Sequence, residues 1–193
     1  ADILTGNREV GPGIVAVRDS GFAEGCHYFA MDYVEGAPLD LALRDSPRSL
    51  RDRVQLFGEI AEAVAAAHVR GVIHRDLKPA NVRVDKHSRA HVLDFGLAKL
   101  VEGSESHSMT ADGQFVGSLP WASPEQVGGG GDVDVRSDVY SLGVMLHQML
   151  TGEFPYVVVG PVREVVRTIV EVEPQPASRT NAHIAHELDT IIL

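Results

Sequence analysis

A short stretch of the sequence gathers side chains that could act on a phosphate group. It holds a carboxylate at Asp76, a cation at Lys78 and an amide at Asn81, and a second carboxylate follows at Asp94. Carboxylate and amide oxygens are hard ligands that suit Mg²⁺ rather than zinc. A nearby Asp can take a proton from a hydroxyl, and a lysine can neutralise charge on a phosphate. The residue types therefore point to metal-assisted chemistry on a phosphate.

Two short apolar-alternating runs would have to position these side chains. They cover residues 82–84 and 91–93, with the polar residues 85–89 between them, and this pattern predicts a strand, a turn and a strand. A hairpin brings its two ends together. We therefore expect Asn81 and Asp94 to lie side by side at the open end of a hairpin.

The same residues resemble the catalytic core of eukaryotic-type protein kinases. His-Arg-Asp-Leu-Lys-Pro-Ala-Asn at residues 74–81 is followed by Asp-Phe-Gly at 94–96. Ser-Pro-Glu at 123–125 resembles the motif that closes the activation segment in this family, and residues 138–143 resemble the start of its buried central helix. Four motifs in the family's order make the resemblance specific. The amino-acid sequences of these motifs are similar to those of bacterial eukaryotic-like Ser/Thr kinases.

This resemblance implies an α+β, protein-kinase-like fold, mostly the helical large lobe with the hinge and the last strands of the small lobe. Residues 1–34 are expected to be the C-terminal remnant of the small lobe with the hinge, and residues 35–193 the large lobe, truncated before its end. The apolar patterns predict strands at 14–18 and 28–33 joined by a turn-rich 19–25, an amphipathic helix at 50–70, a buried helix at 139–150 and a final helix at 181–193.

The resemblance also assigns roles to the four polar residues. Asp76 would orient the acceptor hydroxyl and receive its proton, and Lys78 would contact the γ-phosphate. Asn81 and Asp94 would hold Mg²⁺, which bridges the phosphates of ATP, so ATP and Mg²⁺ are the implied cofactors. The implied reaction is transfer of the ATP γ-phosphoryl group to a Ser or Thr hydroxyl of a protein substrate.

Residues 31–36 resemble the hinge between the two kinase lobes. On that basis Met31 is the gatekeeper, and the backbone of Asp32 and Val34 would bind adenine. Without the downstream motifs, the same residues read as an edge strand. Arg83 departs from the family, which usually places an apolar residue there as the floor of the adenine pocket.

Three further contacts are implied by the resemblance. His74 would pack under Phe95, and Asp138 would accept hydrogen bonds from the backbone of the catalytic loop. Ser118 resembles the Ser or Thr that bridges the carboxylate and the lysine of that loop in Ser/Thr kinases.

Residues 97–121 are expected to form the activation segment, which contains a polar loop at 103–114. Its candidate phosphorylation sites are Ser104, Ser106, Ser108 and Thr110. Thr110 is favoured by its offset from Ser118, and a phosphate there could pair with Arg75. The alternative is a solvated polar loop.

Composition narrows the function classes. A hydrophobic content of 44% is ordinary for a soluble globular domain, and a net charge of -10 argues against a nucleic-acid surface. No apolar run reaches the length of a membrane span, and the single cysteine, Cys26, fits a reducing compartment. We expect a cytoplasmic location, which is compatible with a membrane anchor outside this chain.

A second function class stays open. No lysine precedes Lys78, so the Gly-rich loop and the strand lysine of the small lobe are expected to lie outside this chain, and the chain alone is expected to be inactive. The alternative is a pseudokinase or truncated kinase-like scaffold that acts as a binding module. The intact polar residues argue against it, whereas Arg83 and the missing small-lobe parts argue for it. An enzyme acting on small molecules is disfavoured by residues 123–125.

Overall fold

The computed structural model describes residues 11–95, 118–128 and 133–192. The chain divides into two compact units. Unit 1 comprises Ala1–Pro47, Gln55–His74 and Pro79–Gly103, and unit 2 comprises Arg48–Val54, Arg75–Lys78 and Ser104–Leu193. The boundary expected between residues 34 and 35 stays a prediction.

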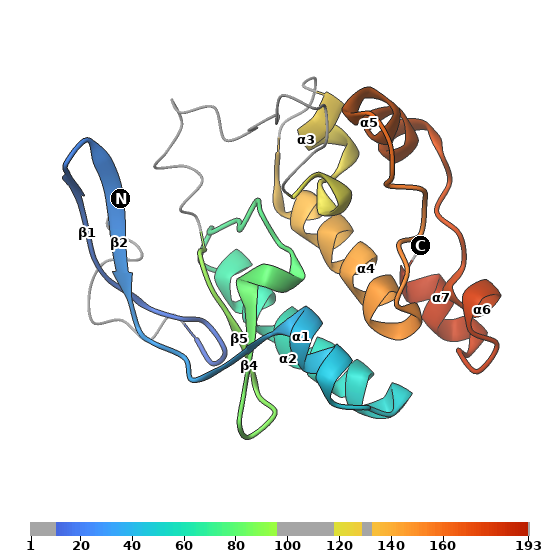
Figure 1. The fold of residues 1–193 in the computed structure, drawn as a ribbon, viewed down its shortest axis with the longest axis horizontal. Helices are drawn as coiled ribbons and strands as arrows, with labels where there is room; N and C mark the ends of the chain where they lie inside the picture. The colour runs from blue at the N-terminus through green and yellow to red at the C-terminus, as the bar shows by residue number, and fades with distance from the viewer. Residues whose placement is uncertain (1–10, 96–117, 129–132, 193) are drawn as a thin grey trace. The chain divides into compact units, whose positions relative to one another are not determined.

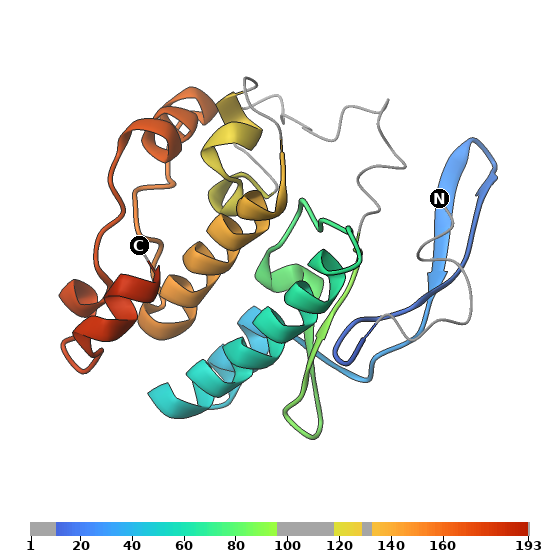
Figure 2. The same ribbon diagram turned by 180° about the vertical axis from the view of Figure 1, so that it is seen from behind.

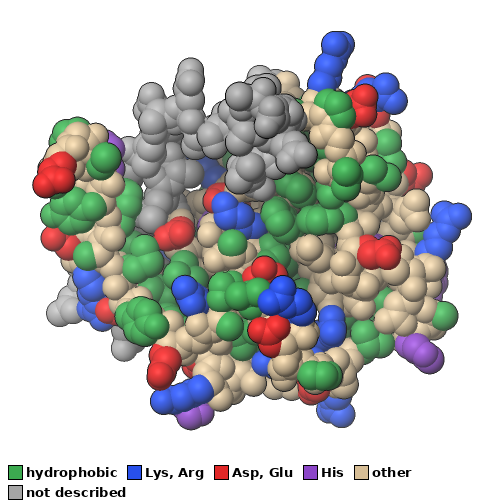
Figure 3. All heavy atoms as spheres, in the orientation of Figure 1, with side chains coloured by type: hydrophobic (Ala, Val, Ile, Leu, Met, Phe, Trp, Pro, Cys, Tyr) green, Lys and Arg blue, Asp and Glu red, His purple; other side chains and the backbone are tan. Residues whose placement is uncertain are grey.

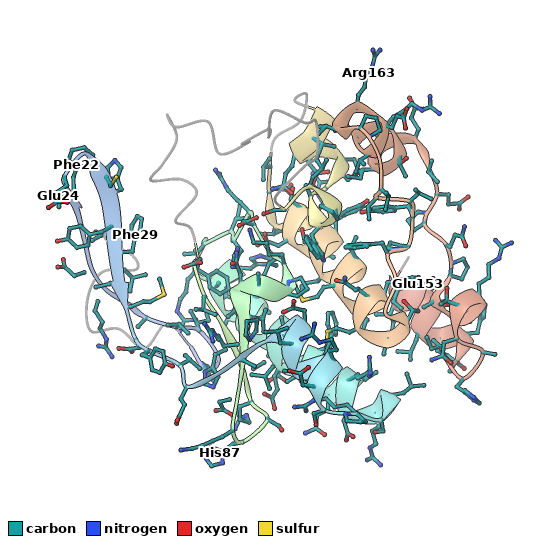
Figure 4. All side chains as sticks on the ribbon, in the orientation of Figure 1. Phe22, Glu24, Phe29, His87, Glu153 and Arg163 are labelled. Atoms are coloured by element: carbon teal, nitrogen blue, oxygen red, sulfur yellow. The ribbon has the colours of Figure 1, made fainter. Side chains whose placement is uncertain are left out.

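The first strands that the structure describes in unit 1 form a two-stranded antiparallel hairpin of β1 (Val17–Ala23) and β2 (Cys26–Met31), seen as the long ribbon pair in Figure 1. Glu24 and Gly25 form its turn with φ values of 52° and 81°. Two consecutive positive φ values are the mark of the two-residue type I′ turn, which matches the twist of paired strands. Figure 4 labels Phe22 and Glu24 at this tip of the hairpin.

The prediction of a turn over residues 19–25 was wrong for residues 19–23, which belong to β1. Gly21, a residue typical of turns, pairs with Tyr28, and the nearest atoms of the Tyr28 side chain lie only 2.6 Å from the position that a Cβ of residue 21 would take. A glycine inside a strand often marks such a close approach. Ile14 lies outside β1 and forms an isolated parallel bridge with Val92.

A second sheet in unit 1 has the order β3 (Gly36–Pro38), β4 (Val82–Asp85) and β5 (Ala90–Val92), all antiparallel. The predicted hairpin of residues 82–93 is therefore confirmed. Along β4 and β5 buried residues alternate with partly exposed ones, so one face of the sheet joins the core. Figure 4 labels His87 at the turn between β4 and β5.

Unit 1 also contains the helices α1 (Leu39–Asp45) and α2 (Leu50–His68), although the first turn of α2 belongs to unit 2. The buried residues of α2 recur every three or four positions, as expected for a helix with one apolar face; they are Leu56, Ile60, Ala63, Val64 and Ala67. Ser49 and Asp52 exchange hydrogen bonds across the first turn in a capping box. Gly71, at φ 74°, follows the end of the helix.

The long helix α4 (Val135–Thr151) carries much of the core of unit 2. It starts one turn earlier than predicted because Asp134 caps it, accepting a hydrogen bond of 2.8 Å from Arg136 N. Gly152 ends it in the left-handed conformation. The labelled Glu153 of Figure 4 follows directly, and its backbone carbonyl accepts a hydrogen bond from His147 Nδ1.

Two short helices, α6 (Ala177–Thr180) and α7 (His186–Ile192), pack against α4, as the reverse view in Figure 2 shows. The final helix was predicted to start at Asn181, but α7 begins only at His186. The reason is local: Asn181 Oδ1 accepts a hydrogen bond from His183 N, and this Asx turn competes with the helix.

Unit 2 also contains η3 (Leu119–Trp121), α3 (Pro124–Gly128) and α5 (Val162–Glu171). Their apolar side chains form one hydrophobic cluster with residues of α4. The buried members of this cluster are Leu119, Val144, Tyr156, Val165 and Ile169. Figure 4 labels Arg163 at the start of α5.

Helices and small antiparallel sheets together make an α+β fold, largely helical, as predicted. On the face shown in Figure 3, acidic and basic side chains are interspersed, and apolar side chains are visible as well. Among the residues that the structure describes, none of the helices is long and apolar enough to cross a membrane.

Candidate active site

Residues 75–78 of the predicted catalytic loop lie in unit 2. Lys78 Nζ donates to Asp76 Oδ2 over 2.8 Å and to Ser118 Oγ over 2.6 Å. Such charge-assisted bonds are stronger than neutral ones. The side chains of Lys78 and Asp76 are 22% and 37% exposed, so both can still be reached by a substrate. Ser118 contacts the loop through the lysine, which in turn contacts the carboxylate.

The backbone of this loop is strained next to Asp76. Arg75 has a φ of 69°, in the left-handed region that non-glycine residues rarely occupy. Such a residue costs roughly 1–3 kcal/mol and persists when its surroundings hold it in place. The expected contact from α4 supplies one such restraint, because Asp138 Oδ1 accepts a hydrogen bond of 2.8 Å from Arg75 N. Asp138 is buried, with 1% of its surface exposed.

A second restraint on the same residue was missed by the sequence interpretation. Gln126 Nε2 donates a hydrogen bond of 2.6 Å to the backbone carbonyl of Arg75. The available signal was the spacing from Ser123 to Gln126 at the start of α3, which is typical of a capping box. That pattern predicts a helix start but does not reveal the bond to a distant loop.

The two candidate metal ligands lie in unit 1. Asn81 is the last residue of the short helix η1 (Pro79–Asn81) and is buried. Its backbone carbonyl accepts a hydrogen bond of 2.9 Å from Leu93 N, directly beyond the last paired residues of β4 and β5. Asp94 is the next residue, with a φ of 61°. The hairpin therefore brings the positions of Asn81 and Asp94 together at its open end.

The segment around Asp94 is also held by a buried histidine. His74 Nε2 donates a hydrogen bond of 2.8 Å to Leu93 O, and because a carbonyl only accepts, this nitrogen carries the proton. The His74 ring packs on Phe95 with ring centroids 4.7 Å apart, as predicted. Both side chains are buried. The residues on each side of Asp94 are therefore fixed.

The donor chemistry of this pair fits Mg²⁺. An amide oxygen and a carboxylate are hard ligands, and Mg²⁺ is usually held by one or two carboxylates together with substrate phosphates and water. Among the residues described, no group of three or more His, Cys, Asp or Glu side chains is placed to hold a metal ion. Asn81 and Asp94 could therefore hold a metal ion that a nucleotide helps to bind.

The residues predicted to form the hinge lie at the end of β2. Met31 pairs with Val17, and Asp32 N donates to the carbonyl of residue 16 over 3.2 Å. The Arg18 guanidinium donates two hydrogen bonds of 2.7 Å to the Asp32 carboxylate and holds its pKa below the usual value. Val34 is partly exposed in the connection to β3. The adenine-binding role of these residues stays a prediction.

Arg83 lies in the middle of the second sheet, between Pro38 on β3 and His91 on β5. Its Nη1 donates a hydrogen bond of 2.7 Å to Gly36 O. The guanidinium is therefore bonded to the sheet on the β3 side. Gly96 and the candidate phosphorylation sites Ser104, Ser106, Ser108 and Thr110 lie outside the described residues.

The chain is similar in sequence to known protein kinases. A family model described as "Protein kinase domain" matches residues 4–192. Serine/threonine-protein kinase PknB of Mycolicibacterium smegmatis is 38% identical over 187 residues, which are 94% of this chain and 29% of that protein. The probable serine/threonine-protein kinase SCO3848 of Streptomyces coelicolor is 36% identical over 187 residues, covering 94% of this chain and 27% of the relative.

Serine/threonine-protein kinase pkn2 of Myxococcus xanthus is 39% identical over 148 residues, which are 75% of this chain and 18% of that protein. The chain spans less than a third of the length of these curated relatives. Since the family model covers nearly the whole chain, the predicted kinase resemblance is confirmed, and the chain belongs to the protein kinase domain family.

Proposed function

We propose that this chain is part of the catalytic domain of a Ser/Thr protein kinase that transfers the γ-phosphoryl group of ATP to a protein Ser or Thr hydroxyl. The observation that carries the proposal is the bonded group of Asp76, Lys78 and Ser118, found in a chain of the protein kinase family. The acceptor class is supported by the relatives, which are named as serine/threonine kinases.

In the proposed reaction, Asp76 orients the acceptor hydroxyl and receives its proton. The hydroxyl oxygen forms a bond to the γ-phosphorus while the bond to the bridging oxygen breaks, and ADP leaves. Lys78 lies 2.8 Å from the Asp76 carboxylate, so its ammonium can both orient that carboxylate and offset charge on the transferred phosphoryl group.

Asn81 and Asp94 are proposed to hold Mg²⁺, which would offset the negative charge of the ATP phosphates. Lys78 and Asn81 are three positions apart in the sequence, which favours a shared task. Met31, Asp32 and Val34 are proposed to hold adenine. The division into small-lobe and hinge residues 1–34 and large-lobe residues 35–193 belongs to the same proposal.

The domain is proposed to work in the cytoplasm, where ATP is available and where a free cysteine such as Cys26 stays reduced. Its partners would be ATP and a protein that presents a Ser or Thr hydroxyl.

The test is transfer of labelled γ-phosphate by the full-length protein, comparing wild type with Asp76→Asn and Asp94→Ala. We expect each substitution to lower the rate by at least ~10²-fold, as removal of a proton acceptor or metal ligand does. Label should appear on Ser or Thr of the substrate. Circular dichroism would check that the variants fold, and equal rates in all three folded proteins would overturn the assignment.

A scaffold without transfer activity is the second candidate, and Arg83 is the observation that favours it. A charged side chain bonded to Gly36 O stands where the family usually has an apolar adenine contact. Calorimetric titration of the full-length protein with Mg²⁺·ATP separates the two candidates, since a scaffold of this type would bind nucleotide only after Arg83→Leu. Binding by the wild type would remove the argument from Arg83.

A further inference from the structure

The side chain of Gln126 bonds at both ends of its amide. Its Oε1 accepts hydrogen bonds from Ser123 N over 2.9 Å and from Ser123 Oγ over 3.2 Å. Its Nε2 donates to Arg75 O over 2.6 Å. Rotating the amide by half a turn would set donor against donor and acceptor against acceptor, so these contacts fix the orientation of the group.

The hydrogen bonds from Ser123 to Gln126 Oε1 hold the Gln126 side chain against the start of α3. Ser123 precedes the helix, Gln126 lies three residues later, and the bond from Ser123 N to the Gln126 side chain is one half of a capping box. Ser123 is fully buried. The neighbouring Glu125 carboxylate accepts a hydrogen bond from Ser137 Oγ on α4, which ties the same turn to the central helix.

The second contact acts on the peptide group that joins Arg75 to Asp76. A peptide unit is planar, so holding the carbonyl oxygen of Arg75 also sets the direction of the Asp76 N–H. Asp138 holds the preceding peptide unit through Arg75 N. Both planes that flank the left-handed Arg75 are therefore held, one from α3 and one from α4.

We propose that Gln126 is a positioning residue for Asp76: its amide N–H, fixed by the cap of α3, holds the Arg75–Asp76 peptide so that the carboxylate faces the acceptor hydroxyl. This inference rests on the proposed kinase function. It requires a side chain that accepts at the cap and donates at the loop. Glutamate, which has the same shape, can accept at the cap but in its ionised form has no proton to donate to Arg75 O.

The variant that isolates this bond is Gln126→Glu in the full-length protein. It keeps an acceptor for Ser123 and replaces the donor to Arg75 O by a carboxylate oxygen. We expect kcat to fall roughly 10- to 100-fold, since a small displacement of a catalytic group has effects of that size. The KM for ATP should stay within about twofold, because the lost bond acts on the loop carboxylate. Gln175→Glu, the same charge change at an exposed position, is the matched control and should leave kcat unchanged.

A pH profile distinguishes positioning from a general loss of structure. Protonation of the carboxylate that Gln126→Glu introduces creates an O–H that can donate to Arg75 O. The ratio of variant to wild-type kcat should therefore rise as the pH falls from about 7 to about 5, toward the ordinary pKa of a Glu side chain, about 4.3. A flat ratio would contradict the proposal. Gln126→Met has a side chain of similar length that can neither donate to Arg75 O nor accept from Ser123, so its kcat should be lower than that of the wild type at every pH. If Gln126→Glu does not fold, the kcat of Gln126→Met tests whether Gln126 positions Asp76.

Asp76→Asn is measured in the same series to separate this inference from the function on which it rests. A wild type no faster than Asp76→Asn would overturn the kinase proposal itself. An active wild type with unchanged kcat in Gln126→Glu or Gln126→Met would overturn the role of Gln126 alone. A rise of KM for ATP in proportion to the fall of kcat would also overturn it, because a positioning role predicts a change in kcat.

Discussion

The two groups of candidate active-site residues are held in different ways. The loop around Asp76 is braced by Ser118, Gln126 and Asp138, which lie 40 to 63 positions away from the residues they contact. The hairpin that carries Asn81 and Asp94 is formed by two strands that are neighbours in the sequence, and β3, Ile14 and His74 add further contacts to it. The conformation of the loop therefore depends on distant parts of unit 2, whereas the strand pairing that forms the hairpin is local in the sequence.

The largest expected effect separates the tasks of the two groups. Asp76→Asn should abolish at least ~99% of phosphoryl transfer while leaving ATP-dependent Mn²⁺ binding intact, because this carboxylate is not proposed to touch the metal. Asp94→Asn should lose that binding, because one of two hard ligands becomes a weaker one. Electron paramagnetic resonance of Mn²⁺ titrated in the presence of ATP measures the binding. Loss of Mn²⁺ binding in Asp76→Asn alone would contradict this division.

The next effect tests the long-range support of the loop. Asp138→Ala removes a buried carboxylate and leaves Arg75 N without this acceptor, so we expect a loss of about 2–3 kcal/mol in the free energy of unfolding. Asp138→Asn keeps an acceptor oxygen and should lose less. Urea unfolding of both variants makes the measurement. Equal losses would show that the bond to Arg75 N is not what stabilises unit 2.

A smaller effect is expected in the hairpin, where Asp85 supports the turn. Its Oδ1 accepts hydrogen bonds from His87 N and Arg89 N, and its Oδ2 lies 2.9 Å from His91 Nε2. The bond from Arg89 N, followed by that of His91, lowers the pKa of Asp85 to about 2. Asp85→Ala should reduce the free energy of unfolding by about 1 kcal/mol at neutral pH.

The pH dependence of that loss follows from the sign of the shift. The folded pKa of Asp85 lies below the ordinary value of 3.8, so its contribution is present above about pH 4 and fades as the pH falls toward 2. The difference between wild type and Asp85→Ala, measured by urea unfolding, should shrink over that range. A difference that grows on acidification would refute the assigned ionised state.

The smallest effect concerns the segment before α3. Tyr156 donates a hydrogen bond of 3.0 Å to Pro120 O and accepts one of 3.1 Å from Tyr140. Burial raises the pKa of Tyr156 far above its usual value, so the phenol stays neutral and keeps donating. Tyr156→Phe should lower the free energy of unfolding by about 0.5–1 kcal/mol, measured by thermal unfolding. Stability above that of the wild type would mean that these bonds contribute nothing.

The same comparison explains what the sequence could predict. The hairpin of residues 82–93 was predicted correctly because strand alternation and a polar turn are local patterns. The contact of His74 with Phe95 and that of Asp138 with the loop came from the family resemblance, since no local pattern gives them. The bond from Gln126 to Arg75 was missed because it joins residues 51 positions apart.

Local patterns also misled where two local preferences competed. The composition of residues 19–23 is typical of a turn. The turn itself is limited to Glu24 and Gly25, which sets the register of β1 with β2, so residues 19–23 are paired as part of β1. The apolar pattern after Asn181 suggests a helix from that residue, but its side chain forms an Asx turn first. Strand pairing across the two-residue turn decided the first case, and side-chain chemistry decided the second.

The central claim is that the loop and the hairpin serve one phosphoryl transfer, and a double-mutant cycle tests it most directly. The rate of a single turnover is measured for wild type, Asp76→Asn, Asp94→Asn and the double variant. Residues that act as a unit are strongly non-additive, so the double variant should be within about tenfold of the slower single variant. Multiplication of the two single losses, to ~10⁴-fold or more, would contradict the claim.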